Sequence, residues 1–220
     1  MNLMNKKTAT LRSTVLLFFI STIFSSVLPG SDVDDIVKKV RKKYESIKTL
    51  HVEFTMTSYW ALTGREETLT GTLSLEGDNR YRIETDTQII VTDGKTLWTY
   101  TKNSNQLIID RLSPSKENPL PRDLLLSYTK DHRAELKGEV TYGGTPCYEL
   151  IFRPREDDAF IVQTRVMVDK KTWLAVLFEQ EDINENRTRY ELRKFSINTP
   201  LSPSLFTFTA PEQAEIIDMR

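Results

Sequence analysis

Cysteine, histidine and glycine are scarce in this chain of 220 residues. Cys147 is the only cysteine, which excludes an intramolecular disulfide and any metal site built from several cysteines. The only histidines are His51 and His132, and neither lies in a recognisable local motif with a serine or cysteine nucleophile. The 8 glycines form no loop that could cradle a phosphate group. The sequence therefore predicts a protein that is not an enzyme and that holds no metal or cofactor.

Basic residues are not in excess once the N-terminal segment is set aside. The first 26 residues carry three basic side chains, Lys6, Lys7 and Arg12, and no acidic one. Of the 30 basic residues, 27 remain for the rest of the chain, against 31 acidic residues, which is a net charge of -4. A chain of this charge lacks the basic surface that nucleic acids require, so we expect no nucleic-acid partner.

The N-terminal segment has the pattern of a secretory signal peptide. Its basic residues precede an apolar run, Val15–Ile20, and small residues such as Ser26 and Gly30 follow. The run is short for a membrane span and polar residues interrupt its continuation, although an uncleaved anchor is the alternative interpretation. The sequence predicts a cleaved signal peptide at 1–30 and a single exported domain at 31–220.

An amphipathic helix is predicted over 31–48. Ser31 and Asp34 fit a capping box at its start. Six apolar residues recur at helical spacing and form one stripe: Val33, Ile36, Val37, Val40, Tyr44 and Ile47. The opposite face is basic between Lys38 and Lys43, and it is either a solvated surface or a docking face for an acidic membrane partner.

From Leu50 onward apolar residues alternate with polar ones, as half-buried β-strands require. The alternation continues to Phe195 in roughly ten to eleven segments joined by turn residues. The clearest hairpin is 89–100, in which two strands rich in β-branched and aromatic residues are joined at Asp93-Gly94. This pattern predicts a mainly β protein with one curved antiparallel sheet.

The alternation stops between Ser113 and Lys130. Three prolines in this interval cannot occupy central strands, but Pro121 can begin a helix. Such a helix would carry four apolar side chains on one face: Leu120, Leu124, Leu125 and Tyr128. A sheet of this size with only two helices to cover its apolar face leaves a concave apolar hollow. We therefore expect this second helix to form a lid over the hollow.

Several segments of the chain resemble one known family, in the same order. Thr92–Tyr100 (TDGKTLWTY) is similar to the DGKTLW-aromatic hairpin of the periplasmic outer-membrane lipoprotein carrier family, LolA. The other similar segments are Leu50–Thr55, Glu179–Asp182, Arg187–Leu192 and Leu205–Pro211. The resemblance covers nearly all of the chain after the predicted signal peptide. It implies an unclosed β-barrel with a small α-helical lid that encloses a hydrophobic cavity.

The resemblance also implies a function. Members of this family accept acylated lipoproteins from an inner-membrane transporter and pass them to an outer-membrane receptor. The receptor has the same fold but is lipid-anchored. Because this chain has no cysteine near its predicted cleavage site, the resemblance favours the soluble periplasmic carrier. We also expect the protein to be a monomer. Two alternatives stay open: a lipid- or lipoprotein-sensing regulatory module on the same scaffold, and an envelope hydrolase that uses His51 or His132.

The chain departs from the family at one turn. The family's carriers usually place Arg-Pro after the second strand, where the arginine holds the lid by hydrogen bonds, whereas this chain has Gly77-Asp78. Arg80 and Arg82 are the nearest substitutes, but the alternation points both away from the face that carries Tyr81.

The residues that we expect to line the cavity come from both helices and from the apolar face of the sheet. They are Val40, Tyr44 and Ile47 of the first helix, Leu124 and Leu125 of the lid, and Val52, Phe54, Met56, Leu73, Tyr81, Ile83 and Trp98 of the sheet. Methionine and aromatic side chains adapt to irregular lipid, although Trp98 is equally consistent with an ordinary core position. We predict that these side chains contact an acyl chain.

Overall fold

A computed structural model describes residues 33–113, 132–156 and 158–220. These residues form one α-helix, twelve strands and one short 3-10 helix. The helix α1 spans Val33–Glu45 and the 3-10 helix η1 spans Pro203–Phe206. The strands are β1 Thr49–Trp60, β2 Arg65–Glu76, β3 Arg80–Thr85, β4 Gln88–Asp93, β5 Thr96–Thr101, β6 Gln106–Arg111, β7 His132–Tyr142, β8 Thr145–Pro154, β9 Ile161–Asp169, β10 Ala175–Asp182, β11 Arg187–Ile197 and β12 Glu215–Asp218.

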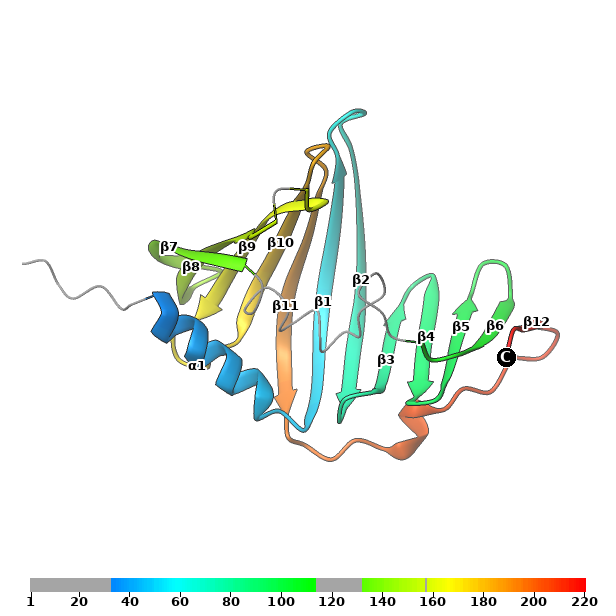
Figure 1. The fold of residues 1–220 in the computed structure, drawn as a ribbon. Coiled ribbons are helices and arrows are strands. Elements are labelled where there is room, and N and C mark those ends of the chain that lie inside the picture. Colours follow the sequence, from blue (N-terminus) through cyan, green and yellow to red (C-terminus); the bar gives the residue numbers. More distant parts are fainter. Residues whose placement is uncertain (1–32, 114–131, 157) are drawn as a thin grey trace, which may run out of the picture. The chain divides into compact units, whose positions relative to one another are not determined.

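The twelve strands form one sheet in the order β12-β6-β5-β4-β3-β2-β1-β11-β10-β9-β8-β7 (Figure 1). Neighbouring strands are antiparallel except β12 and β6, which run parallel. Within the described residues β7 and β12 do not pair with each other, so the sheet is open at these two edges. The predicted mainly β fold with an unclosed, curved sheet is confirmed. The additional strand, β12, is only 4 residues long, too short for alternation to reveal it.

The predicted hairpin at 89–100 is present as β4 and β5, but its turn lies one residue later than expected. β4 ends at Asp93 and β5 begins at Thr96, so Gly94 and Lys95 are the central residues. Gly94 has a φ of 95°, which a residue without Cβ adopts without a clash. Oδ1 of Asp93 accepts the backbone N–H groups of Lys95 at 2.9 Å and of Thr96 at 2.8 Å. Asp93 therefore caps the turn instead of occupying its centre.

The helix α1 lies across one face of the sheet (Figure 1). Its apolar stripe supplies the buried side chains Ile36, Val40 and Tyr44, and Ile47 follows just after the helix ends. These residues share a core with apolar side chains of β1, β8 and β9: Leu50, Val52, Leu150, Phe152, Val166 and Val168. The predicted first helix is thus confirmed within the described residues, and hydrophobic burial holds it to the sheet.

A smaller apolar layer lies on the opposite face, where the C-terminal tail crosses the sheet. η1 packs beside β3 and β4, and its Phe206 is only 1% exposed. Val91 and Leu107, which the register turns toward this face, are also buried. The ring of Phe208 lies 5.4 Å from the ring of Tyr100 on β5. The tail therefore covers the β3–β6 half of the sheet on the face opposite α1.

Some predicted features fall outside the described residues. They include the signal peptide at 1–30, the three prolines after Ser113 and the lid helix with Leu124 and Leu125. In the part of the chain that the structure does describe, no helix is both long enough and apolar enough to cross a membrane.

Candidate functional site

An apolar pocket of about 330 Å³ lies on the α1 face of the sheet. It is lined by Val52, Phe54, Met56, Leu69, Leu73, Ile83, Thr85, Thr87, Gln88, Phe178, Tyr190 and Leu192. Nine of these side chains are aliphatic, aromatic or thioether groups. The three polar ones, Thr85, Thr87 and Gln88, all come from the region where β3 turns into β4. The pocket thus has an apolar body and one polar end.

Strand register brings the apolar lining together. Phe178 of β10 is the partner of Tyr190 on β11, which is the partner of Met56 on β1. Leu69 of β2 continues the same row. Because side chains alternate between the two faces of a sheet, all four members of this row face the pocket.

The ring of Phe54 lies against Gly71, its cross-strand partner on β2. A Cβ atom on Gly71 would lie 2.7 Å from Cζ of Phe54 and 2.5 Å from the carbonyl oxygen of Glu84. The ring of Phe54 also meets the ring of Tyr190 edge-on, with centroids 6.3 Å apart, and the Tyr190 ring lies 6.4 Å from that of Phe178. Burial among these groups raises the pKa of the Tyr190 hydroxyl. An aromatic cluster thus forms one wall of the pocket.

The structure divides the predicted cavity residues into groups. Five of them line the apolar pocket: Val52, Phe54, Met56, Leu73 and Ile83. Four others are buried in the core between α1 and the sheet: Val40, Tyr44, Ile47 and Tyr81. Contact of any of these nine side chains with an acyl chain stays a prediction.

Tyr44 and Trp98 differ most from their expected placement. The Tyr44 hydroxyl accepts the backbone N–H of Ala175 at 3.1 Å. Burial raises the pKa of Tyr44 to about 12, and this hydrogen bond opposes the rise only in part. Tyr44 therefore anchors α1 inside the core. Trp98 pairs with Val91 on the face away from the pocket, whereas its neighbour Leu97 packs against the α1 core.

Four apolar lining residues were not predicted: Leu69, Phe178, Tyr190 and Leu192. Each belongs to a strand that the sequence predicts, and each occupies one of the apolar positions that alternate with polar ones along that strand. The local pattern does not reveal that β11 is the neighbour of β1, because these strands are far apart in the sequence. For the polar end formed by Thr85, Thr87 and Gln88, the sequence indicated a turn but not a part of a binding site.

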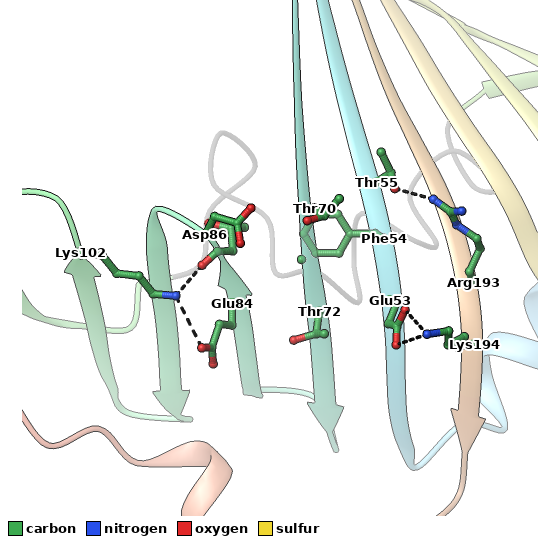
Figure 2. Close-up of a pocket in the computed structure, with 12 residues that line it drawn as sticks. Glu53, Phe54, Thr55, Thr70, Thr72, Glu84, Asp86, Lys102, Arg193 and Lys194 are labelled. Atoms are coloured by element: carbon green, nitrogen blue, oxygen red, sulfur yellow. Dashed lines mark hydrogen bonds and ion pairs between the residues drawn. The ribbon is translucent and has the colours of Figure 1, made fainter.

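A second pocket, of about 550 Å³, lies on the other face of the same strands and is charged (Figure 2). Register places Glu53 of β1 beside Thr72 of β2, and Thr72 beside Glu84 of β3. Figure 2 shows the threonines of β2 in the middle, with charged side chains on both sides. We call this pocket, with Glu53, Thr55, Thr70, Thr72, Glu84, Asp86, Lys102, Arg193 and Lys194, the charged pocket.

Most charges in the charged pocket are paired. Nζ of Lys194 lies 2.9 Å from Oε2 of Glu53, and Nζ of Lys102 lies 3.6 Å from Oε1 of Glu84. Burial opposes the charge of Glu84, but a hydrogen bond from Arg82 and the nearby lysine hold the pKa of its carboxyl below the ordinary value. The guanidinium of Arg193 donates to the Thr55 hydroxyl at 2.6 Å. Three cations and three carboxylates leave this pocket without a dominant sign of charge.

The two pockets meet at a notch in the sheet. Phe54 and Thr85 line both pockets. Pairing between β2 and β3 begins at Gly71 and Thr85, so the earlier part of β2 has no partner on that side among the described strands. Figure 1 shows the long β1–β2 hairpin rising beyond the shorter β3–β4 hairpin. We call the gap between Leu69–Gly71 and the β3–β4 turn the notch.

The two arginines near the β2–β3 turn point away from α1, as the alternation predicts. Nε and Nη2 of Arg82 donate to Oε2 of Glu84 at 3.0 and 2.7 Å. The guanidinium of Arg80 lies 5.6 Å from the ring centre of Phe206, on the face that the tail covers. Tyr81 between them packs in the α1 core.

The histidines form no common site. His51 is on β1 and His132 on β7, with four strands between them in the sheet. Nδ1 of His51 lies 2.9 Å from Oγ of Ser74, but Ser74 is buried, so the pair presents no nucleophile to a substrate. Burial raises the pKa of the Cys147 thiol, which opposes thiolate formation. Among the described residues no group of three His, Cys, Asp or Glu side chains is close enough to hold a metal ion.

Comparison with known proteins identifies relatives of this chain. Residues 45–209 match the family model described as outer membrane lipoprotein carrier protein LolA. The protein MJ0687 of Methanocaldococcus jannaschii, described as uncharacterized, is 26% identical over 207 residues. That match covers 92% of this chain but only 58% of the relative, so the chain spans less than two thirds of its length.

A second relative and a solved structure are also similar to this chain. An outer-membrane lipoprotein carrier protein of Coxiella burnetii (strain RSA 331 / Henzerling II) is 27% identical over 161 residues, covering 67% of this chain and 70% of that protein. The crystal structure of an uncharacterized conserved protein from Thermus thermophilus superposes with a TM-score of 0.54 at 16% identity. It covers 84% of this chain and 97% of that chain, and this likeness shows a shared fold.

Proposed function

The chain belongs to the family of the outer membrane lipoprotein carrier protein LolA, and on this premise we propose that it carries lipoproteins by their acyl chains. It takes lipoproteins released from the inner membrane and delivers them to the outer membrane. The observation that supports this role is the apolar pocket on the α1 face, which is lined mostly by aliphatic and aromatic side chains and which has one polar end. An acyl chain would lie along the apolar body, with its polar attachment toward the β3–β4 turn.

The energetics of lipid burial require such a pocket. Burial of one methylene group away from water is favourable by about 0.8 kcal/mol. Exposing an acyl chain of about 15 methylenes to water therefore costs roughly 12 kcal/mol. A carrier must offset most of this cost and still release its cargo. The pocket of about 330 Å³ is at the small end of the usual range for ligand sites. An apolar pocket of this size suits reversible binding.

The proposed partners and compartment follow from the same role. The N-terminal pattern supports export, with the signal peptide removed and the protein acting in the periplasm as a monomer. An inner-membrane transporter would load it with acylated lipoprotein, and an outer-membrane receptor would accept the cargo. No cofactor takes part in such a transfer.

The proposal is tested with the purified mature protein and membranes that hold a labelled lipoprotein. We expect a soluble complex to form and then to deliver the label to outer membranes. A soluble complex that never delivers its cargo would instead identify a sensor on the same scaffold. Failure to form any complex would reject acyl-chain binding and with it the carrier role.

Two substitutions on β1 make the test specific to the apolar pocket. Met56→Glu places a carboxylate in the apolar pocket, and we expect it to abolish formation of the complex. Thr57→Glu is the matched control, because the next residue of the strand points to the opposite face. Equal loss in both variants would contradict binding in this pocket.

A further inference from the structure

Strand β2 extends past its partner β3 by the six residues Arg65–Thr70. Strand β1 pairs with one side of this segment along its whole length, whereas no described strand pairs with the other side. All six residues are exposed except Leu69, which is half-buried. We call this side of Arg65–Thr70 the free edge, and it borders the notch.

The backbone groups on the free edge come from alternate residues. The N–H of Gly77 donates to the carbonyl of Lys48 at 2.9 Å, which sets the phase of hydrogen bonding between β1 and β2. In an antiparallel pair, hydrogen-bonded and non-hydrogen-bonded positions alternate along the strand. Counting back along β2, this phase turns the N–H and C=O groups of Glu66, Thr68 and Thr70 away from β1. A short ladder of donors and acceptors therefore faces the notch.

The side chains of the same segment reach both pockets. Leu69 lines the apolar pocket and Thr70 lines the charged pocket. Charged side chains that deter strand pairing are confined to Arg65–Glu67 near the hairpin end, and the stretch beside the notch is uncharged. A chain extended along this stretch would direct alternate side chains to the two pockets.

We propose that the free edge binds the polypeptide part of an acylated protein as an added strand, while the acyl chain of that protein lies in the apolar pocket. This inference rests on the proposed carrier function and adds how the protein part of the cargo is held. Strand addition binds through main-chain hydrogen bonds, so it accepts many sequences. A fatty acid or phospholipid has no peptide ladder and gains nothing from the free edge.

The charged pocket supplies contacts for cargo side chains. The guanidinium of Arg193 has the Thr55 hydroxyl as its hydrogen-bond partner among the described residues, so it can also bind a carboxylate. Asp86 lies at the other side of the pocket, in the β3–β4 turn. These two groups suit a peptide with side chains of either sign better than a lipid headgroup of one fixed charge.

A substitution pair at Thr68 tests the main-chain contact. Thr68→Pro removes an N–H that faces the free edge, and proline is tolerated in a strand where that group has no partner in the sheet. Thr68→Ala is the matched control. It loses the same contact between the hydroxyls of Thr68 and Thr57, which are 3.2 Å apart, but it keeps the N–H.

Three probes separate peptide binding from acyl binding. They are an N-palmitoylated hexapeptide of alternating serine and valine, the same lipopeptide with every second amide N-methylated, and palmitate alone. We expect Thr68→Pro to weaken binding of the lipopeptide about tenfold relative to Thr68→Ala, the effect of losing one or two hydrogen bonds. Palmitate should bind both variants equally, and wild-type protein should bind the N-methylated lipopeptide about tenfold more weakly.

The outcomes distinguish this inference from the proposed function. If the Thr68→Pro and Thr68→Ala variants bind the lipopeptide equally, or if N-methylation has no effect on wild-type protein, strand addition is wrong and acyl carriage stands. If wild-type protein binds neither palmitate nor the lipopeptide, the proposed function itself fails. Should Thr68→Pro lower the melting temperature strongly, the N-methylated lipopeptide on wild-type protein decides the question.

Discussion

The ring of Phe54 occupies the space that a side chain on Gly71 would need, and the carbonyl oxygen of Glu84 closes that space from the other neighbouring strand. This relationship lies at the notch, where the apolar pocket and the charged pocket meet. The absence of one side chain on β2 thus lets an aromatic ring lie against the strand. The packing at this point determines both the stability of the sheet and the shape of the pocket.

Substitution of Gly71 should therefore destabilise the protein. In Gly71→Ala the new methyl group would stand 2.5 Å from a backbone oxygen, which cannot move without shifting β3. We expect a loss of about 1–3 kcal/mol in the free energy of unfolding, as for other overpacked sites. Urea denaturation measures this loss. Thr70→Ala, at an exposed position of the same strand, should change stability by less than about 0.5 kcal/mol.

Removal of the Tyr44 hydroxyl should loosen α1 from the sheet. Tyr44→Phe leaves the buried N–H of Ala175 without its acceptor. We expect a cost of about 1–3 kcal/mol in unfolding free energy, the penalty for an unsatisfied buried donor. Thermal unfolding followed by circular dichroism checks this expectation. A variant as stable as the wild-type protein would show that this hydrogen bond does not hold the helix.

The same hydroxyl should make stability depend on pH in the alkaline range. The pKa of Tyr44 rises from 10.0 to about 12 on folding, mainly because of burial. Its contribution to stability is fully present below pH 10. The contribution is lost as the pH rises toward 12, because the unfolded chain releases this proton first. Two units of pKa correspond to about 2–3 kcal/mol, measured as the difference between the wild-type and Tyr44→Phe stability curves. Parallel curves between these pH values would contradict the buried titration.

The C-terminal tail should contribute much of the stability of the β3–β6 half. Phe206 is 1% exposed and fills the space over β3 and β4. We expect Phe206→Ala to cost about 3–5 kcal/mol, because it leaves a cavity. Phe160→Ala is the control for loss of an aromatic ring, since Phe160 is 58% exposed. Similar unfolding midpoints in urea for the two variants would show that the tail is only loosely attached.

Local sequence patterns predicted much of the fold. Alternation from Leu50 to Phe195 predicted the antiparallel strands, because each strand buries one face and leaves the other to polar groups. Helical spacing predicted α1 in the same way. The sequence predicted the hairpin of β4 and β5 but placed its turn at Asp93-Gly94, one residue too early. In the structure the turn is at Gly94-Lys95, and the Asp93 carboxylate caps it by accepting backbone hydrogen bonds.

The candidate site was predictable only on the strands that the hairpins join directly. Val52, Phe54 and Leu73 share a face through one hairpin, so alternation was enough to group them. Phe178 and Tyr190 reach the same pocket only because β11 pairs with β1, although these two strands are separated by most of the sequence. The alternation around Trp98 did not show which face borders the pocket, because this half of the sheet carries apolar side chains on both faces.

The sequence by itself determined which residues are apolar, how they repeat, and therefore that this protein folds as strands with an amphipathic helix. Only the tertiary structure decided which strands became neighbours, which part of β2 extends beyond the described strands that pair with it, and which apolar side chains border a pocket instead of filling a core. The physical reason is that periodicity follows from the geometry of each strand alone. Neighbours and cavities depend on long-range pairing, and no short stretch of sequence specifies such pairing.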